Sequence, residues 1–287
     1  MRQLFYILFL LLVWYNLFAQ SSTIVQPVDY YRFETATIDS GSIRVLYALN
    51  AVDINDIKTY DDLQRLDIGS KFSKSYSFFI FNCDSLKRAW MKKNPNSSVI
   101  PTWLGERGKK EKWSIFIWSV FVKDFSENIL TEYALMPHFI PNYQYSENLP
   151  VQEWDLHDDT ITVCGYLCQK ATCHFRGREY TAWFAPEIPV GNGPWKFGGL
   201  PGLILKVYDS ERFYVFECIK IESHTKKYPI IKYDEKIFKK IEQSKLRQLD
   251  KSMYKDFYTV GGWNVSKTGA PPYDKFIPLP YHPLELE

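Results

Sequence analysis

A stretch rich in glycine and proline, residues 186–202, constrains the fold of this chain more than any other feature. Pro186 and Pro189 each lack an amide hydrogen and fix φ, so a strand running through residues 180–185 must leave its hydrogen-bonded ladder there. The run Leu-Pro-Gly-Leu at 200–203 fits a type II turn, with proline at the second position and glycine at the third. A rigid, irregular connection between two strands is therefore predicted.

Large aromatic residues lie within and beside this connection. Trp183 belongs to the strand that precedes it, and Trp195 and Phe197 lie inside it, where they can plug one edge of a core. Because they are large and apolar, these three side chains are also candidates for contact with a ligand or a partner.

The rest of the chain favours strands. Aromatic residues make up 17% of it, and many lie in short alternating runs between turn residues. A hairpin is expected with an outgoing strand at 160–175, a turn at Arg176-Gly177-Arg178 and a return strand at 180–185. A turn at 39–41 is expected to separate two more strands. The chain is thus predicted to be mainly β, with an α+β organisation.

The clearest helical pattern covers residues 235–254, where apolar residues recur among many charged ones. This spacing gives one apolar stripe, which is typical of an amphipathic helix packed on a sheet. Several prolines interrupt residues 261–287 and exclude regular structure. An irregular, Pro-rich tail is therefore expected after the helix.

The N-terminus has the three-part pattern of a cleavable signal peptide over residues 1–19. Arg2 supplies the positive charge, an almost uninterrupted apolar run follows, and Ala19 is a small residue before a cut at Gln20. Gln20 is not a cysteine, so no lipid anchor is indicated. We expect an exported chain with a single β-rich domain over 20–260, in the periplasm, at the outer-membrane periphery or outside the cell.

Charge and hydropathy exclude two classes of partner. The chain has 35 Lys and Arg against 33 Asp and Glu, which lacks the basic excess typical of nucleic-acid binders. Beyond the signal segment, no run is long and apolar enough to span a bilayer. Neither nucleic acid nor a transmembrane span of the mature chain is expected.

One motif carries a family resemblance. The run Gly-Leu-Pro-Gly-Leu-Ile at 199–204 resembles the signature of the GLPGLI family of exported bacterial proteins. The similarity extends from about Trp154 to Asp209, through the runs at 165–171 and 175–178. It implies an exported, β-rich protein of a family without an established activity. Separately, the geometry of the connection resembles that of half-barrel lipoprotein carriers, so a curved antiparallel sheet, half-barrel-like, with helices as a lid is expected.

The cysteines fit an oxidising compartment, where one or two disulfides are expected among Cys83, Cys164, Cys168, Cys173 and Cys218. An odd number leaves at least one thiol unpaired, and the pairing stays open. The paired spacing of structural zinc sites is absent, and the alternating acids at 153–159 are read as a solvated strand face. No metal ligand and no cofactor is therefore assigned.

Charged residues complete the candidate site. Glu187 lies in the rigid connection, where it could pair with Arg176, Arg178 or Lys196, and the two arginines at the hairpin tip could contact a partner. The candidates for ligand or partner binding are Trp183, Glu187, Trp195, Phe197, Arg176 and Arg178.

The expected function is that of an exported, non-enzymatic binding module for an apolar ligand or a cell-envelope protein. No nucleophile elbow, phosphate loop, zinc-protease or dinucleotide motif is present. A hydrolase or thiol enzyme using Cys168 or Glu187 and a metal-binding protein are the alternatives. A deep apolar cavity between helix and sheet would support the ligand version.

Overall fold

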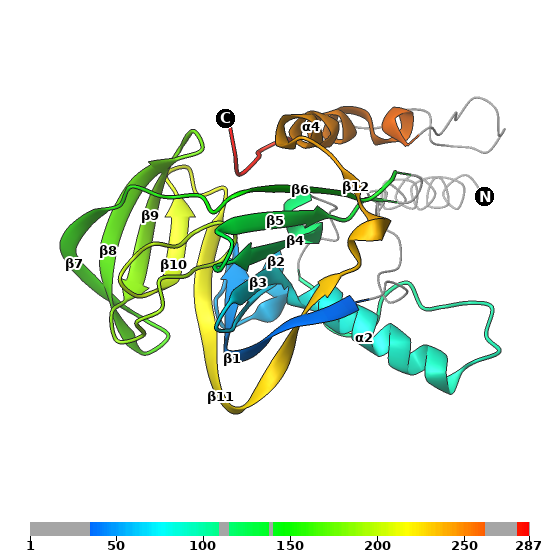
Figure 1. Cartoon of the computed structure of the whole chain (residues 1–287), viewed down its shortest axis with the longest axis horizontal. Helices are drawn as coiled ribbons and strands as arrows, with labels where there is room; N and C mark the ends of the chain where they lie inside the picture. Colours follow the sequence, from blue (N-terminus) through cyan, green and yellow to red (C-terminus); the bar gives the residue numbers. More distant parts are fainter. Residues whose placement is uncertain (1–34, 109–114, 138–139, 262–279, 287) are drawn as a thin grey trace, which may run out of the picture.

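The computed structural model describes residues 35–108, 115–137, 140–261 and 280–286. The predicted signal segment and most of the predicted tail lie outside these residues. The described part is built on one curved sheet of twelve strands, in the order β12-β6-β5-β4-β3-β2-β1-β11-β10-β9-β8-β7 (Figure 1). Neighbours are antiparallel, except that β12 is parallel to β6. The mainly β prediction is confirmed, with one parallel pair at an edge.

The strands are β1 (Thr35–Leu49), β2 (Asp62–Ile68), β3 (Phe72–Ser77), β4 (Ser119–Asp124), β5 (Ile129–Ala134), β6 (Tyr143–Asn148), β7 (Asp155–Val163), β8 (Tyr166–Phe175), β9 (Arg178–Ala185), β10 (Leu203–Asp209), β11 (Val215–Tyr233) and β12 (Lys239–Lys240). The helices are α2 (Phe78–Lys93), α3 (Ile115–Trp118) and α4 (Gln243–Val260), with 3₁₀ turns η2 (Ile57–Thr59) and η3 (Glu235–Ile237). Within the described ranges, none of these helices has the length and apolar character needed to cross a membrane.

Two meanders, each sequential along the chain, make up the sheet. Strands β1 to β6 follow one another as neighbours on one side, and β7 to β11 do so on the other. In the described sheet the meanders join at the β1–β11 pair, where Thr35 lies opposite Tyr233 and Leu49 opposite Phe216. Figure 1 shows the β7–β10 strands turning away from β2–β6 around this long pair, which gives the sheet its curvature.

The turn expected at 39–41 is wrong, because β1 runs through these residues as one bulged strand. Gly41 is needed in that strand, since a Cβ there would lie 2.3 Å from the ring of Tyr228. The Asp39 carboxylate accepts the backbone amide of Lys71 at 2.7 Å and so stabilises the turn between β2 and β3. Asp39, Ser40 and Gly41 are residue types common in turns, but here they form part of a bulged strand. Asp39 also stabilises the neighbouring β2–β3 turn.

The outgoing strand expected at 160–175 is two strands, β7 and β8. Cys164 and Gly165 separate them with φ values of 50° and 84°, a left-handed pair typical of a tight hairpin turn. The turn predicted at Arg176-Gly177-Arg178 is confirmed, because Arg176 and Gly177 also have positive φ and β9 begins at Arg178.

The helix predicted over 235–254 begins later, at Gln243, and continues to Val260. Residues 235–237 form a 3₁₀ turn capped by the Asp234 side chain, and Lys239–Lys240 pairs with β6. The cap and the sheet edge satisfy backbone groups that a helix would have used, so the helix starts after them. Leu246 and Met253 of the predicted apolar stripe pack on and beside β5 and β6, in a cluster with Ala134, Met136 and Tyr145, and Phe257 beyond the predicted helix joins them.

Candidate functional site

The Gly- and Pro-rich connection between β9 and β10 is built into the main core. Trp195 and Phe197 are 1% and 0% exposed, and their rings meet edge to face at 5.0 Å. They also contact the rings of Phe175 and Tyr180, which come from β8 and β9. The apolar side chains of the connection are therefore held in place by an aromatic cluster.

Lys123, on β4, fastens the same connection through its backbone. The ammonium donates to Oδ1 of Asn192 at 2.8 Å and to the carbonyls of Gly193 at 3.2 Å and Phe197 at 2.5 Å. These acceptors use all three hydrogens of the ammonium. Burial of the charge lowers the pKa of Lys123 to about 7. The lysine is thus a structural anchor for the connection.

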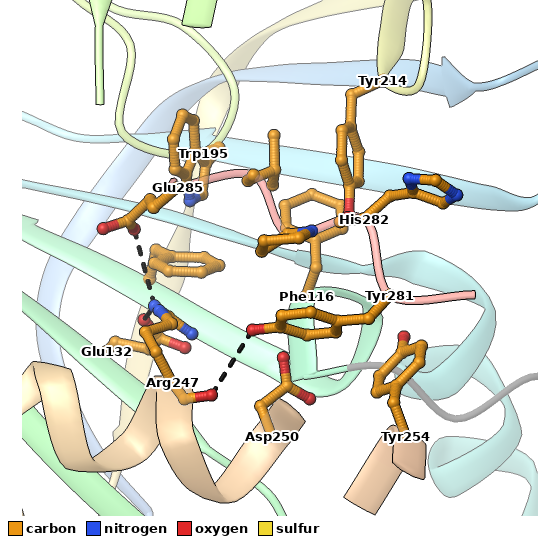
Figure 2. Close-up of a pocket in the computed structure, with 13 residues that line it drawn as sticks. Phe116, Glu132, Trp195, Tyr214, Arg247, Asp250, Tyr254, Tyr281, His282 and Glu285 are labelled. Atoms are coloured by element: carbon orange, nitrogen blue, oxygen red, sulfur yellow. Dashed lines mark hydrogen bonds and ion pairs between the residues drawn. The ribbon is translucent and has the colours of Figure 1, made fainter. Parts of the chain in front are cut away.

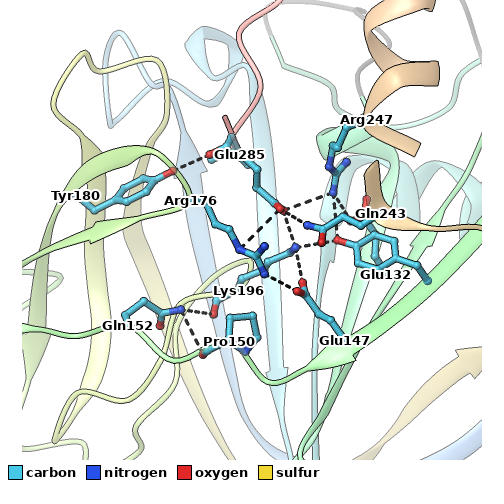
Figure 3. Close-up of polar contacts among 12 residues, drawn as sticks. Glu132, Glu147, Pro150, Gln152, Arg176, Tyr180, Lys196, Gln243, Arg247 and Glu285 are labelled. Atoms are coloured by element: carbon cyan, nitrogen blue, oxygen red, sulfur yellow. Dashed lines mark hydrogen bonds and ion pairs between the residues drawn. The ribbon is translucent and has the colours of Figure 1, made fainter. Parts of the chain in front are cut away.

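Lys196, inside the connection, is the centre of a buried charged network (Figure 3). Its Nζ lies 2.5 Å from Oε1 of Glu285, 2.6 Å from Oε1 of Glu147 and 2.8 Å from the hydroxyl of Tyr145. Glu147 and Tyr145 belong to β6, whereas Glu285 belongs to residues 280–286, here called the tail segment. One ammonium group therefore joins the connection, the sheet and the tail segment.

Two arginines extend this network. Arg247, on α4, pairs with Glu132 at 2.6 Å and with Glu285 at 3.5 Å. Arg176, in the β8–β9 turn, pairs with Glu147. Arg247 on the helix and Arg176 at the hairpin tip thus link Glu285 to the two strands that carry Glu132 and Glu147, with Nε of Arg176 4.0 Å from Oε2 of Glu285.

The network is balanced in charge. Its cations are Arg176, Lys196 and Arg247, and its carboxylates are Glu132, Glu147 and Glu285. Burial opposes the ionisation of Glu132, but Arg247 and Lys196 outweigh it and lower the pKa of that carboxyl. The carboxylate of Glu132 is therefore stabilised by the cations around it, although it is removed from water.

Backbone contacts hold the tail segment against the hairpin. Arg178 donates to the carbonyl of Pro283 from Nε at 3.0 Å and from Nη2 at 2.7 Å. The hydroxyl of Tyr180 donates to the carbonyl of Leu284 at 3.0 Å. Asp209 orients Arg178 through an ion pair of 3.0 Å. These donors recognise main-chain carbonyls, which every peptide carries.

Three further contacts fix the tail segment. The amide of Leu286 donates to the carbonyl of Arg176 at 2.9 Å, and the hydroxyl of Tyr214 donates to the carbonyl of His282. The His282 ring stacks on Phe213 with centroids 4.1 Å apart. We call the surface that contacts residues 280–286 the tail groove, lined by Arg176, Arg178, Tyr180, Lys196, Phe213, Tyr214 and Arg247. Its chemistry is that of binding an extended peptide through carbonyls and one carboxylate.

A small pocket lies between the tail segment, α4 and Trp195 (Figure 2). Its volume of about 30 Å³ has room for one or two water molecules. Asp250 lines the pocket at 6% exposure, and its Oδ1 has no hydrogen-bond partner among the described residues. Burial raises the pKa of Asp250 to about 7, although Arg247 opposes this. This carboxyl therefore changes protonation near neutral pH.

The structure separates the aromatic and basic residues predicted for the site. Arg176 and Arg178 lie together in the tail groove, where they contact the chain's own tail segment. Trp195 lines the small pocket. Phe197 and Trp183 are 0% and 9% exposed and belong to the core.

Glu187 lies apart from these residues, exposed on the connection. The ion pairs expected for it are wrong for the described residues, because the three cations have other partners. Arg176 pairs with Glu147, and Lys196 pairs with Glu147 and Glu285. Arg178 pairs with Asp209 at the end of β10 and with Glu211 in the β10–β11 turn.

Lys123, Arg247, Asp250 and Glu285 were not predicted from the sequence. A signal existed for Lys123, because it alternates with Phe121 and Ser119 in a strand and so shares their inward face. The Pro-rich run around Glu285 has no periodicity that would place it in a core. Its position depends on contacts with residues more than one hundred positions earlier in the chain.

All five cysteines are free thiols in the structure, and Cys164 alone among them is exposed. The disulfides expected from the sequence are therefore not shown. Burial raises the pKa of Cys168 to about 11 and that of Cys173 to about 12, which keeps both as weakly nucleophilic thiols at neutral pH. Among the described residues, no three His, Cys, Asp or Glu side chains gather where they could hold a metal ion.

Comparisons with known proteins add one family match. Residues 174–206 match a family described as a protein of unknown function, Porph_ging. No curated protein matches the chain. Two structures of PNGF-II, in the P21 and C2 space groups, align with 14% identity, TM-scores of 0.45 and 0.44, and 73% and 72% of this chain. The chain spans about a third of their length (33% and 32%), and similarity at this level carries no argument about function.

Proposed function

We propose that this chain is an exported member of the GLPGLI family that acts as a non-enzymatic binding module for an extended, acidic segment of a cell-envelope protein. The family match at 174–206 supports the first part, because the Gly-Leu-Pro-Gly-Leu-Ile run at 199–204 lies inside it. The signal-like segment at 1–19 supports export.

The observation that carries the binding proposal is the seating of the tail segment. The groove contacts backbone carbonyls through Arg178, Tyr180 and Tyr214, and it receives one carboxylate between Lys196 and Arg247. Carbonyl contacts give affinity for any extended peptide, and a buried cationic socket selects an acidic residue. The tail segment occupies the groove as a partner peptide would.

The same observation disfavours an apolar ligand at this site. The pocket next to the tail segment has a volume of about 30 Å³, whereas pockets for drug-sized ligands measure roughly 300–1,000 Å³. Glu132, Arg247 and Asp250 also line it, so a hydrocarbon chain would meet charged and polar atoms. The partner version of the binding hypothesis is therefore the stronger one.

A peptide titration tests the groove. The probe is a fluorescent peptide with the sequence of residues 280–286, and the receptor is the full chain with Glu285→Ala, which weakens its own tail contact. We expect binding to this variant at least tenfold tighter than to the unchanged chain. Replacing the glutamate of the peptide by glutamine should lower its affinity for this receptor at least tenfold.

The control receptor is a chain with Glu285→Ala and Arg178→Leu, which lacks the carbonyl donors and should bind the peptide least. If the peptide binds none of these receptors, the tail groove is a fixed part of the fold and the proposal fails. Export is tested separately, because N-terminal sequencing of the cell-envelope protein should give a mature chain that starts near Gln20.

A further inference from the structure

A second charged cluster lies on the face of the sheet opposite Lys123. The carboxylate of Asp67, on β2, accepts from Nε of Arg44 at 2.8 Å, from Nη2 of Arg65 at 3.1 Å and from the hydroxyl of Tyr76 at 2.7 Å. Lys74, on the neighbouring strand β3, lies close enough to Asp67 and Arg65 to interact electrostatically with both. Three cations therefore surround one carboxylate.

Two cationic groups of this cluster have donors without a hydrogen-bond acceptor in the described part of the chain. Lys74 is 4% exposed, and its ammonium meets the ring faces of Tyr76 at 4.6 Å and Tyr233 at 5.4 Å, with no acceptor among the described residues. Nε of Arg65, which is 7% exposed, is also without a partner in the described part of the chain. Ring faces compensate a buried cation only in part, and such a charge favours a nearby anion.

A pocket opens beside Lys74. Its volume is about 40 Å³, and it lies between β3, β4, β11 and the first turns of α2. The charged residues of its lining are Lys74 on β3 and Asp84 and Arg88 on α2. Arg88 is exposed at the rim, whereas Asp84 is buried. Outside the lining, Arg44 and Arg65 pair with Asp67, and Glu222 interacts with both arginines. Four cations and three carboxylates thus lie in and beside the pocket, which leaves a net charge of +1.

We propose that this pocket binds a single small anionic group, a carboxylate or a phosphoryl group, with Lys74 as its buried ligand and Arg88 at the entrance. The volume suits one such group and excludes a large ligand. Tyr76 and Ser77 also line the pocket, but their hydroxyls donate to Asp67 and Asp62, so Lys74 and Arg88 supply the donors for the anion. The site is separate from the tail groove, because it lies on the other face of the sheet.

Titration with simple anions tests this site. Isothermal titration of the purified full chain at pH 6.5 uses sodium phosphate and sodium acetate, each against sodium chloride of equal ionic strength. We expect saturable binding of phosphate, acetate or both. Phosphate alone would identify a phosphoryl group, acetate alone a carboxylate, and each of these outcomes supports the proposal.

Two variants and a control localise the binding. Lys74→Met should lower the association constant at least tenfold, and Arg88→Gln should lower it about threefold. Lys71→Met removes an exposed lysine of the β2–β3 turn and should leave binding unchanged. Because Arg88→Gln changes an exposed side chain, it tests the site even if Lys74→Met fails to fold. Absence of binding above chloride, or equal binding by the unchanged chain and both pocket variants, would overturn the proposal.

Discussion

Lys74 and Lys123 occupy neighbouring positions of one strand pair, yet their surroundings are opposite. In the β3–β4 register, Ser73 lies opposite Lys123 and Lys74 opposite Val122, so the two lysines point to different faces of the sheet. Each is 4% exposed, and burial lowers the pKa of each to about 7. Lys123 saturates its ammonium with three acceptors, whereas Lys74 contacts two aromatic rings. Burial therefore does not reveal the role of a charge, but its partners do.

The largest expected effect is that of Lys123→Met. The substitution leaves the acceptors on Asn192, Gly193 and Phe197 without their donor in the core, while it removes the cost of a buried charge. We expect a loss of about 2–4 kcal/mol in the free energy of unfolding, measured with urea. Lys71→Met, at an exposed position, is the control and should change little. A loss under about 1 kcal/mol would show that the connection does not depend on this anchor.

The next effect concerns the tail groove, where the charges are paired. Glu285→Gln leaves Lys196 and Arg247 with one carboxylate fewer, so we expect a loss of about 2–3 kcal/mol and faster cleavage of the tail in limited proteolysis. The matched control is Glu211→Gln, because Glu211 pairs with Arg178 but its side chain is 63% exposed. It should cost less than about 0.5 kcal/mol. Equal losses of stability for the two variants would contradict a specific role for the Glu285 carboxylate between Lys196 and Arg247.

Lys74→Met should act in the opposite direction from Lys123→Met. At pH 6 and in chloride alone, it removes a buried charge without acceptors, so we expect a gain of up to about 1 kcal/mol in the free energy of unfolding. The pKa of Lys74 is about 7 in the folded chain and 10.5 in the unfolded chain. Between these values the unfolded chain binds more protons, so this lysine makes stability rise with pH.

The advantage of Lys74→Met should therefore shrink from pH 7 toward pH 10, as the lysine of the unchanged chain becomes neutral. Urea unfolding at several pH values measures it. A clear loss of stability at pH 6 would mean that Lys74 has a structural partner, and the contrast with Lys123 would disappear.

The smallest effect is expected for Asp250→Asn. The pKa of Asp250 is about 7 in the folded chain and 3.8 in the unfolded chain, so the folded chain binds more protons between these values. Ionisation of this group therefore lowers stability as the pH rises from about 4 to 7. In the variant, stability should fall less steeply with pH over this range. At pH 7 its thermal unfolding temperature should equal or slightly exceed that of the unchanged chain. An unchanged slope would contradict a buried, titrating Asp250.

The sequence predicts local features of this fold better than distant ones. The breaks at Pro186 and Pro189 and the turn at Arg176-Gly177-Arg178 follow from backbone chemistry, and they lie where expected. Gly41 is different, because the contact that requires it involves Tyr228, far along the chain. Local patterns describe a residue's own backbone, whereas its partners across a sheet depend on the whole topology.

The candidate site was harder to predict for the same reason. The two arginines of the hairpin tip were identified, but their ligand in the structure is a segment whose prolines suggested only an irregular tail. Glu285 has no local signal, since its burial arises from Lys196 and Arg247. Alternation in β4 could have identified Lys123 as an inward lysine, although not the three acceptors that it binds.

The joining of the two meanders at β1 and β11 has a consequence for how the protein reaches its native state. Each meander can form from contacts between neighbours in the sequence, but the pair in the middle of the sheet unites residues as distant as Thr35 and Tyr233. Until that pair closes, β1 and β11 both present open edges that can pair with other chains. Such long-range pairing is slow. Assembly of the sheet therefore passes through a stage in which two half-sheets expose unpaired strand edges. At that step, aggregation competes with folding.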